Sequence, residues 1–112
     1  MVKITFIRVA SRTDINPGEM KKVRAGVLDI LIVNIGGDYY AIDNRCPHAN
    51  GDLSRGRLSE SVIKCPRHGA KFDVTTGRLV APLRILGEEI QVANLKTYEV
   101  RQEGDDILVN IG

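Results

Sequence analysis

Two short loops contain every cysteine and histidine of this 112-residue sequence. The first loop carries Cys46 and His48 in a C-x-H pattern, and the second carries Cys65 and His68 in a C-x-x-H pattern. Sixteen residues separate the two pairs, and each loop includes a proline that restricts the turn. Thiolate and imidazole groups bind transition metals, and both spacings let a pair converge on one metal or one edge of a cluster. The sequence therefore predicts a metal site made of four ligands from two loops.

Three other interpretations of these residues remain open at this point. Cysteines in a soluble domain are often small buried hydrophobes, although this does not explain why both loops share one pattern. A disulfide between Cys46 and Cys65 would leave both histidines unexplained. A structural zinc ion is the stronger rival, because two cysteines and two histidines satisfy tetrahedral zinc. Zinc modules, however, usually pair two cysteines in one motif and two histidines in the other.

The elements that must position these loops are predicted to be strands. Isoleucine and valine are abundant while tryptophan is absent, and turn signals recur at short intervals, a pattern typical of an all-β protein. The segment 26–35 is apolar on both faces, so we expect it inside a sandwich or small barrel. Residues 45–69 show little strand pattern and are predicted to be a functional insert built of loops. The predicted strands are 4–9, 26–35, 39–43, 62–64, 71–74, 88–93, 97–103 and 106–110.

Length and composition limit the remaining possibilities. Residues 1–112 are expected to form one domain, with 43% hydrophobic and 27% charged residues. A formal net charge of +2 gives no argument for nucleic acid or an anionic membrane as a partner. No apolar stretch approaches the about 20 residues of a membrane span, and the first residues lack the pattern of a signal peptide. We therefore expect a cytoplasmic protein without a membrane anchor, acting as a monomer.

The four-ligand pattern resembles the signature of the Rieske 2Fe-2S proteins. In that signature C-x-H is followed by C-P-x-H-G, and a leucine and a glycine follow the first pair at the positions of Leu53 and Gly56. Further matches to soluble Rieske ferredoxins follow the second loop, namely Phe72, Thr76, Gly77 and Pro82. The resemblance covers most of the chain. It implies stacked antiparallel sheets with a small loop-built cluster-binding subdomain.

The resemblance also implies a ligand set and an activity. Cys46 and Cys65 would bind one iron of a single 2Fe-2S cluster, and His48 and His68 would bind the other, outer iron. Neutral imidazoles favour ferrous iron, so the histidine iron would take the electron. No nucleophile, acid–base pair or phosphate-binding loop suggests an enzyme, and no catalytic residue is predicted.

Departures from the high-potential Rieske proteins indicate the low-potential branch of the family. The resemblance places Gly51 and Arg67 where those proteins have a disulfide between the loops, and Ala70 and Phe72 where they have a serine and a tyrosine. The lost hydroxyls would remove hydrogen-bond donors to sulfur and lower the potential.

The sequence thus predicts a soluble one-electron carrier. The resemblance suggests a reductase as donor and a ring-hydroxylating oxygenase or another redox protein as acceptor. The alternatives are a Rieske subunit of a multisubunit oxidoreductase, such as a nitrite reductase, and a zinc-stabilised interaction module. Local charge suggests where a partner docks, because residues 45–69 carry a net charge of +3 while the remaining chain sums to −1. The basic residues of this segment are Arg45, Arg55, Arg57, Lys64 and Arg67.

Overall fold

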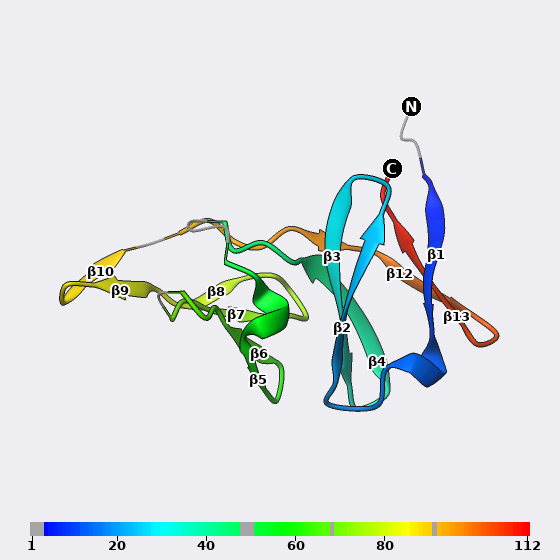
Figure 1. The fold of residues 1–112 in the computed structure, drawn as a ribbon, viewed down its shortest axis with the longest axis horizontal. Coiled ribbons are helices and arrows are strands. Elements are labelled where there is room, and N and C mark those ends of the chain that lie inside the picture. Colours follow the sequence, from blue (N-terminus) through cyan, green and yellow to red (C-terminus); the bar gives the residue numbers. More distant parts are fainter. Residues whose placement is uncertain (1–3, 48–50, 68, 91) are drawn as a thin grey trace.

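The chain folds into antiparallel sheets in two halves, as a computed structural model shows (Figure 1). The structure describes residues 4–47, 51–67, 69–90 and 92–112. One half is a sandwich of two sheets. Its first sheet has the order β1-β13-β12, and its second has the order β11-β4-β3-β2. The strands of the sandwich are β1 (Phe6–Ser11), β2 (Met20–Ala25), β3 (Leu28–Ile35), β4 (Asp38–Asp43), β11 (Thr97–Tyr98), β12 (Val100–Glu103) and β13 (Asp106–Asn110).

The other half, which we call the small half, contains a four-stranded sheet and a hairpin. The sheet has the order β5-β6-β7-β8, and the β9–β10 hairpin projects at the far end of the long axis (Figure 1). These strands are short: β5 (Arg57–Ser59), β6 (Val62–Lys64), β7 (Lys71–Asp73), β8 (Leu79–Ala81), β9 (Leu83–Ile85) and β10 (Glu88–Ile90). Two 3-10 turns, η1 (Arg12–Asp14) and η2 (Leu53–Arg55), complete the fold.

Strand β3 organises both cores because it is buried on both faces. Ile30 and Ile32 face the β1-β13-β12 sheet and pack with Ile107 and Val109. The alternate residues of β3, such as Leu31, belong to a second core shared with the small half. This confirms the prediction of a two-sided apolar strand inside a sandwich. The second core consists of Leu31, Val33, Ile42, Cys46, Leu53, Ile63, Cys65, Ala70, Phe72, Val74 and Leu95.

Several boundaries differ from the prediction for local physical reasons. Gly26 is not a strand residue but begins the β2–β3 turn, where its φ of 63° suits glycine. The predicted strand 97–103 is two strands, because the chain passes from the second sheet to the first at Glu99. The predicted strand 88–93 is described only as β10, ending at Ile90. Strands β2, β5, β8 and β9 were not predicted, and the segment 45–69 contains β5, β6 and η2 as well as loops.

Candidate metal centre

The two cysteines come from separate loops and are buried in the same core. Cys46 follows β4 and is 1% exposed, while Cys65 directly follows β6 and is 2% exposed. The structure holds both as thiols, which excludes the disulfide interpretation. Gly51 lies between them, because a Cβ atom at this position would be 2.8 Å from the Cys65 Sγ atom and 3.6 Å from the Cys46 Cβ atom. The predicted cysteine pair is therefore brought together by the fold.

The predicted histidine ligands, His48 and His68, lie outside the described residues. Each directly follows a described part of its loop, Pro47 in the first and Arg67 in the second.

The first loop closes on itself through backbone hydrogen bonds. The Cys46 amide donates to the Gly51 carbonyl at 2.9 Å, and the Leu53 amide donates to the Asn44 carbonyl at 2.8 Å. An isolated antiparallel bridge joins Arg45 to Asp52 between these two bonds. The chain therefore leaves Cys46 and returns beside it within a few residues, which fixes the Cys46 backbone against the rest of the core.

A side-chain network not predicted from the sequence fixes the base of the first loop. The Asp52 carboxylate accepts hydrogen bonds from the Ser54 hydroxyl at 2.5 Å, the Asn44 amide group at 2.8 Å and the Ser54 backbone amide at 3.1 Å. The Ser54 amide also donates to the Asn44 Oδ1 atom at 3.0 Å. These bonds, that of the Ser54 hydroxyl above all, lower the pKa of Asp52 from its ordinary 3.8 to about 2. The only sequence signal was Asp52 two residues before Ser54, a pattern that caps a helical turn such as η2.

The second loop is the connection of the β6–β7 hairpin. The Cys65 amide donates to the Ala70 carbonyl at 2.8 Å, and the Gly69 amide donates to the Cys65 carbonyl at 3.2 Å. Gly69 has a φ of 81°, a conformation that side chains with a Cβ rarely adopt. The turn therefore depends on the glycine of the C-P-x-H-G motif.

The two loops meet at Gly56, the residue that ends η2. A Cβ atom on Gly56 would overlap the carbonyl oxygen of Lys64, the residue before Cys65, and would lie 3.1 Å from the Leu53 carbonyl oxygen. Only a residue without a side chain lets these segments approach so closely. Gly51 makes a similar contact, because its Cβ position is 3.1 Å from the Arg67 Cγ atom. Positions 51 and 67 thus lie side by side, where the resemblance places the disulfide of high-potential proteins.

The donor set and its surroundings fit a 2Fe-2S cluster. Buried thiolates are unfavourable unless a positive centre compensates them, and iron does so in protein clusters. Two buried cysteines from two loops lie close together around Gly51, and each loop carries a histidine in the sequence, which matches the two-cysteine, two-histidine set of Rieske centres.

Comparisons with known proteins agree with this site. The Rieske [2Fe-2S] domain family matches residues 5–98. The ferredoxin component of biphenyl 2,3-dioxygenase from Rhodococcus jostii (strain RHA1) is 38% identical over 108 residues, covering 96% of this chain and 94% of that protein. The ferredoxin subunit of 3-phenylpropionate/cinnamic acid dioxygenase from Shigella flexneri serotype 5b is 34% identical over 100 residues, covering 88% of this chain and 86% of that protein.

Solved structures show the same fold. The ferredoxin of carbazole 1,9a-dioxygenase from Nocardioides aromaticivorans IC177 has a TM-score of 0.80 and 34% identity, over 94% of this chain and 96% of that one. A chain from the complex of reduced oxygenase and oxidised ferredoxin in carbazole 1,9a-dioxygenase has a TM-score of 0.79 and 28% identity, over 94% of this chain and 92% of that one.

The fold, the cysteine pair and these comparisons define the class of protein. This chain belongs to the Rieske [2Fe-2S] domain family. Within the family it is a ferredoxin, an electron carrier with a 2Fe-2S cluster rather than an enzyme. Among the described residues, no helix is long and apolar enough to cross a membrane.

Proposed function

We propose that this ferredoxin carries single electrons from a reductase to the terminal oxygenase of an aromatic-ring dioxygenase system in the cytoplasm. The observation that carries the proposal is the buried pair of cysteine thiols from two loops, in a chain that matches ferredoxin components of such systems over nearly its whole length. The oxygenase–ferredoxin complex of carbazole 1,9a-dioxygenase supports the choice of acceptor.

We assign Cys46 and Cys65 to one iron and His48 and His68 to the other. When bound, the cluster stores one electron at a time between its oxidised and reduced forms. The chain contributes a rigid, dry surrounding on the cysteine side, because both thiols are buried among apolar residues of the second core. The hydrogen bonds that close the two loops hold the cysteine backbones in place, so little rearrangement is needed when an electron arrives or leaves.

We also place this ferredoxin at the low end of the Rieske potential range. Ala70 and Phe72 are both buried on the second loop and β7, and neither carries a hydroxyl group that could donate to sulfur. Hydroxyl donors stabilise the more negative, reduced cluster, so their absence favours the oxidised form.

The ligand assignment is tested by substitution of the histidines. We expect His48→Ala and His68→Ala each to lose the Rieske EPR spectrum of the reduced protein. The conservative variants His48→Cys and His68→Cys keep a metal-binding side chain, and we expect any cluster they hold to have a lower potential. Unchanged spectra and potentials in all four variants would show that other residues bind the cluster.

The electron-transfer proposal is tested by mixing the reduced ferredoxin with an oxidised oxygenase. The oxygenase component of the Rhodococcus jostii biphenyl system is a suitable acceptor, because its own ferredoxin is 38% identical to this chain. We expect reoxidation at a rate that rises with the oxygenase concentration. Reoxidation by a chemical oxidant but not by the oxygenase would contradict the proposal.

A further inference from the structure

One groove in the small half of the molecule is lined by five basic residues and by no acidic residue. It has a volume of about 890 Å³ and lies between the end of η2, strand β5, the Cys65 loop, strand β9 and the start of β2. Met20, Leu58 and Pro66 supply apolar surface within it. We call it the basic groove, after Arg55, Arg57, Lys64, Arg67 and Arg84.

Most of the positive charge in this groove is not neutralised by the chain itself. Arg57, Lys64 and Arg67 form no ion pair with any described residue. Arg55 reaches Asp52 only at 3.8 Å with its side chain 84% exposed, and Arg84 pairs with Glu89 at 2.8 Å. Two of the five cations therefore have a neighbouring carboxylate and three have none among the described residues, so the groove keeps a net positive charge.

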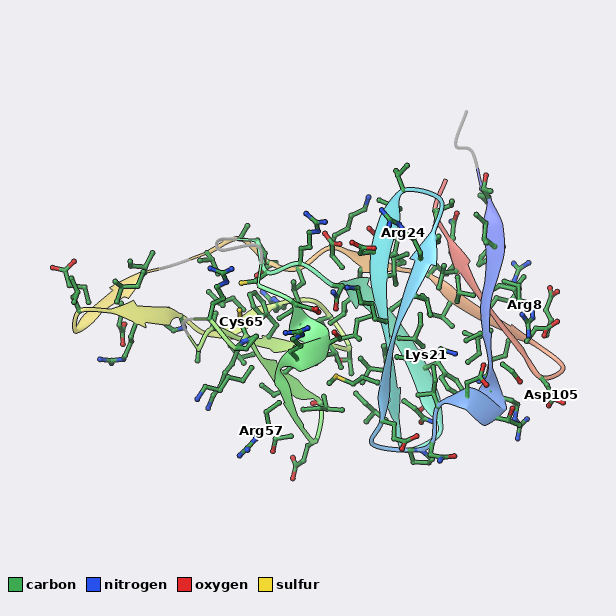
Figure 2. The ribbon with its side chains drawn as sticks, in the orientation of Figure 1. Arg8, Lys21, Arg24, Arg57, Cys65 and Asp105 are labelled. Carbon is green, nitrogen blue, oxygen red and sulfur yellow. The ribbon has the colours of Figure 1, made fainter. Side chains whose placement is uncertain are left out.

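The basic residues of the sandwich half behave differently. Most of its described cations are paired with nearby carboxylates, and Lys96, which lies over the Tyr98 ring, is the exception. The pairs are Arg8 with Asp106, Arg12 with Asp105, Lys21 with Asp14, Lys22 with Asp52, Arg24 and Arg45 with Asp29, and Arg101 with Glu103. Figure 2 shows Arg8, Lys21, Arg24 and Asp105 in this half, and Arg57 and Cys65 in the small half. The unpaired positive charge is therefore concentrated on one side of the molecule. Like charges around one groove repel each other, and a negatively charged ligand would relieve that repulsion.

The position of the groove indicates what that ligand is. Cys65, Pro66 and Gly69 of the second loop form part of its wall, so a molecule in the groove lies beside the proposed cluster ligands. An electron carrier must bring its cluster close to its partner, and a surface beside the ligand loop meets that need. The groove has room for several side chains, and its apolar residues suit protein better than a free phosphate.

We propose that the basic groove binds an acidic segment of the redox partner, rich in aspartate and glutamate. This inference rests on the proposed function and extends it by naming the docking surface and the chemistry of the partner. Exposed charges of this kind mainly increase the rate at which two proteins meet in the correct orientation. Arg84 has a particular part, because it brings the β9–β10 hairpin into a surface whose other basic residues are Arg55, Arg57, Lys64 and Arg67.

The test compares two double variants with the same change in net charge. The groove variant is Arg57→Glu with Arg84→Glu, and the control is Arg78→Glu with Arg8→Glu. Each double variant changes one arginine without an ion pair among the described residues and one arginine paired to a carboxylate at 2.7–2.8 Å. Both variants should keep the iron content and EPR spectrum of the wild type, because neither changes a proposed ligand.

The first measurement is binding of fluorescent poly-L-glutamate to the cluster-loaded proteins at low salt. We expect the groove variant to bind at least about tenfold more weakly than the control, since only position distinguishes them. Equal losses in both variants would overturn the proposal, because they would show an effect of net charge alone. An oligothymidylate of equal length serves as the second probe. Tighter binding of oligothymidylate than of poly-L-glutamate would also overturn it, in favour of a nucleic acid.

The second measurement is electron transfer to the oxygenase of the biphenyl system. We expect the wild-type rate to fall as salt shortens the screening length from about 30 to 8 Å, and the groove variant to be at least about tenfold slower than the control at low salt. If the wild type transfers electrons and both variants keep its rate, the groove inference fails while the proposed function stands. If the wild type transfers none, the proposed function fails first and the inference with it.

Discussion

Replacement of Gly56 with alanine tests whether close contact between the two loops holds the metal centre together. Gly56 ends η2 in the first loop, and a Cβ atom at this position would overlap the Lys64 carbonyl oxygen beside the second. Because the φ of Gly56 is −76°, alanine is compatible with the backbone conformation, and only the contact opposes it. The substitution therefore isolates the packing of the loops from backbone strain.

The size of the effect follows from the geometry. A Cβ atom in ordinary contact stays 3.4 Å or more from its neighbours, so the Lys64 carbonyl must withdraw by about 1 Å. Lys64 precedes Cys65, and metal ligands must hold their distances within about 0.2 Å. Overpacking of this kind costs about 1–3 kcal/mol. We therefore expect Gly56→Ala to bind little iron or to lose its cluster much faster than the wild type.

Gly104→Ala is the matched control. Gly104 lies in the β12–β13 turn with a φ of 61° and nothing within 4 Å of a Cβ atom. Alanine there costs about 1–2 kcal/mol of stability through backbone strain alone. We expect this variant to unfold at a lower temperature and yet to retain full iron and sulfide content. If Gly56→Ala kept its iron and lost the visible absorbance of its cluster no faster than Gly104→Ala, the reasoning on loop contact would be refuted.

Three further predictions concern stability and potential. The lowered pKa of Asp52, about 2, means that its carboxylate form stabilises the fold. The side chain is about one-third exposed, so after solvent screening we expect a contribution of about 1–2 kcal/mol to the free energy of unfolding. This contribution is present above pH 4 and is lost as the pH falls towards 2. Asp52→Asn should therefore lower the unfolding temperature at pH 7 by about 4 °C or more, and this difference from the wild type should shrink below pH 4. Equal unfolding temperatures at pH 7 would contradict the prediction. Leu86 is 98% exposed and has a φ of 52° in the β9–β10 turn, directly before Gly87. Asparagine adopts this conformation more readily than leucine, so Leu86→Asn should raise the free energy of unfolding by about 1 kcal/mol. An unchanged or lower unfolding temperature would count against this prediction. Ala70→Ser combined with Phe72→Tyr should raise the midpoint potential measured by voltammetry, whereas an unchanged or lower potential would mean that solvent or backbone amides set it.

The sequence predicted the parts of the fold that depend on local pattern. Strand β3 has apolar residues at every position from Ile30 to Val33. Such a strand must be covered on both faces, so it is expected in the interior of a layered β structure. The cysteine and histidine pairs were visible because they are the only residues of their kinds and stand in two similar, proline-containing motifs. Chemistry that resides in residue type and spacing can be read before the structure is known.

Other features depend on contacts between distant residues and could not be predicted in the same way. Strands β5, β8 and β9 have three residues each, and they are defined by their pairing with β6, β7 and β10 respectively rather than by a pattern of their own. Strand β2 carries Lys21, Lys22 and Arg24, which an edge strand tolerates. These charges mask the alternation of apolar and polar residues by which a strand is predicted from sequence.

The distribution of charge also changed on folding. Arg45 counted towards the basic segment in the sequence, but in the structure it lies 3.4 Å from the Asp29 carboxylate. Arg84 lies outside that segment in the sequence, yet it lines the basic groove. The sequence predicted an excess of positive charge near the metal centre. Which residues form it depends on the fold, because the fold brings Arg84 of β9 beside the second loop.

The most direct test for the Rieske cluster is an EPR spectrum of the dithionite-reduced wild-type protein, with iron and sulfide analysis of the same sample. We expect about two iron and two sulfide ions per chain and a Rieske spectrum with couplings to the nitrogens of two histidines. A colourless protein that contains zinc would contradict it. So would a cluster without nitrogen coupling, held by the four cysteines of two chains.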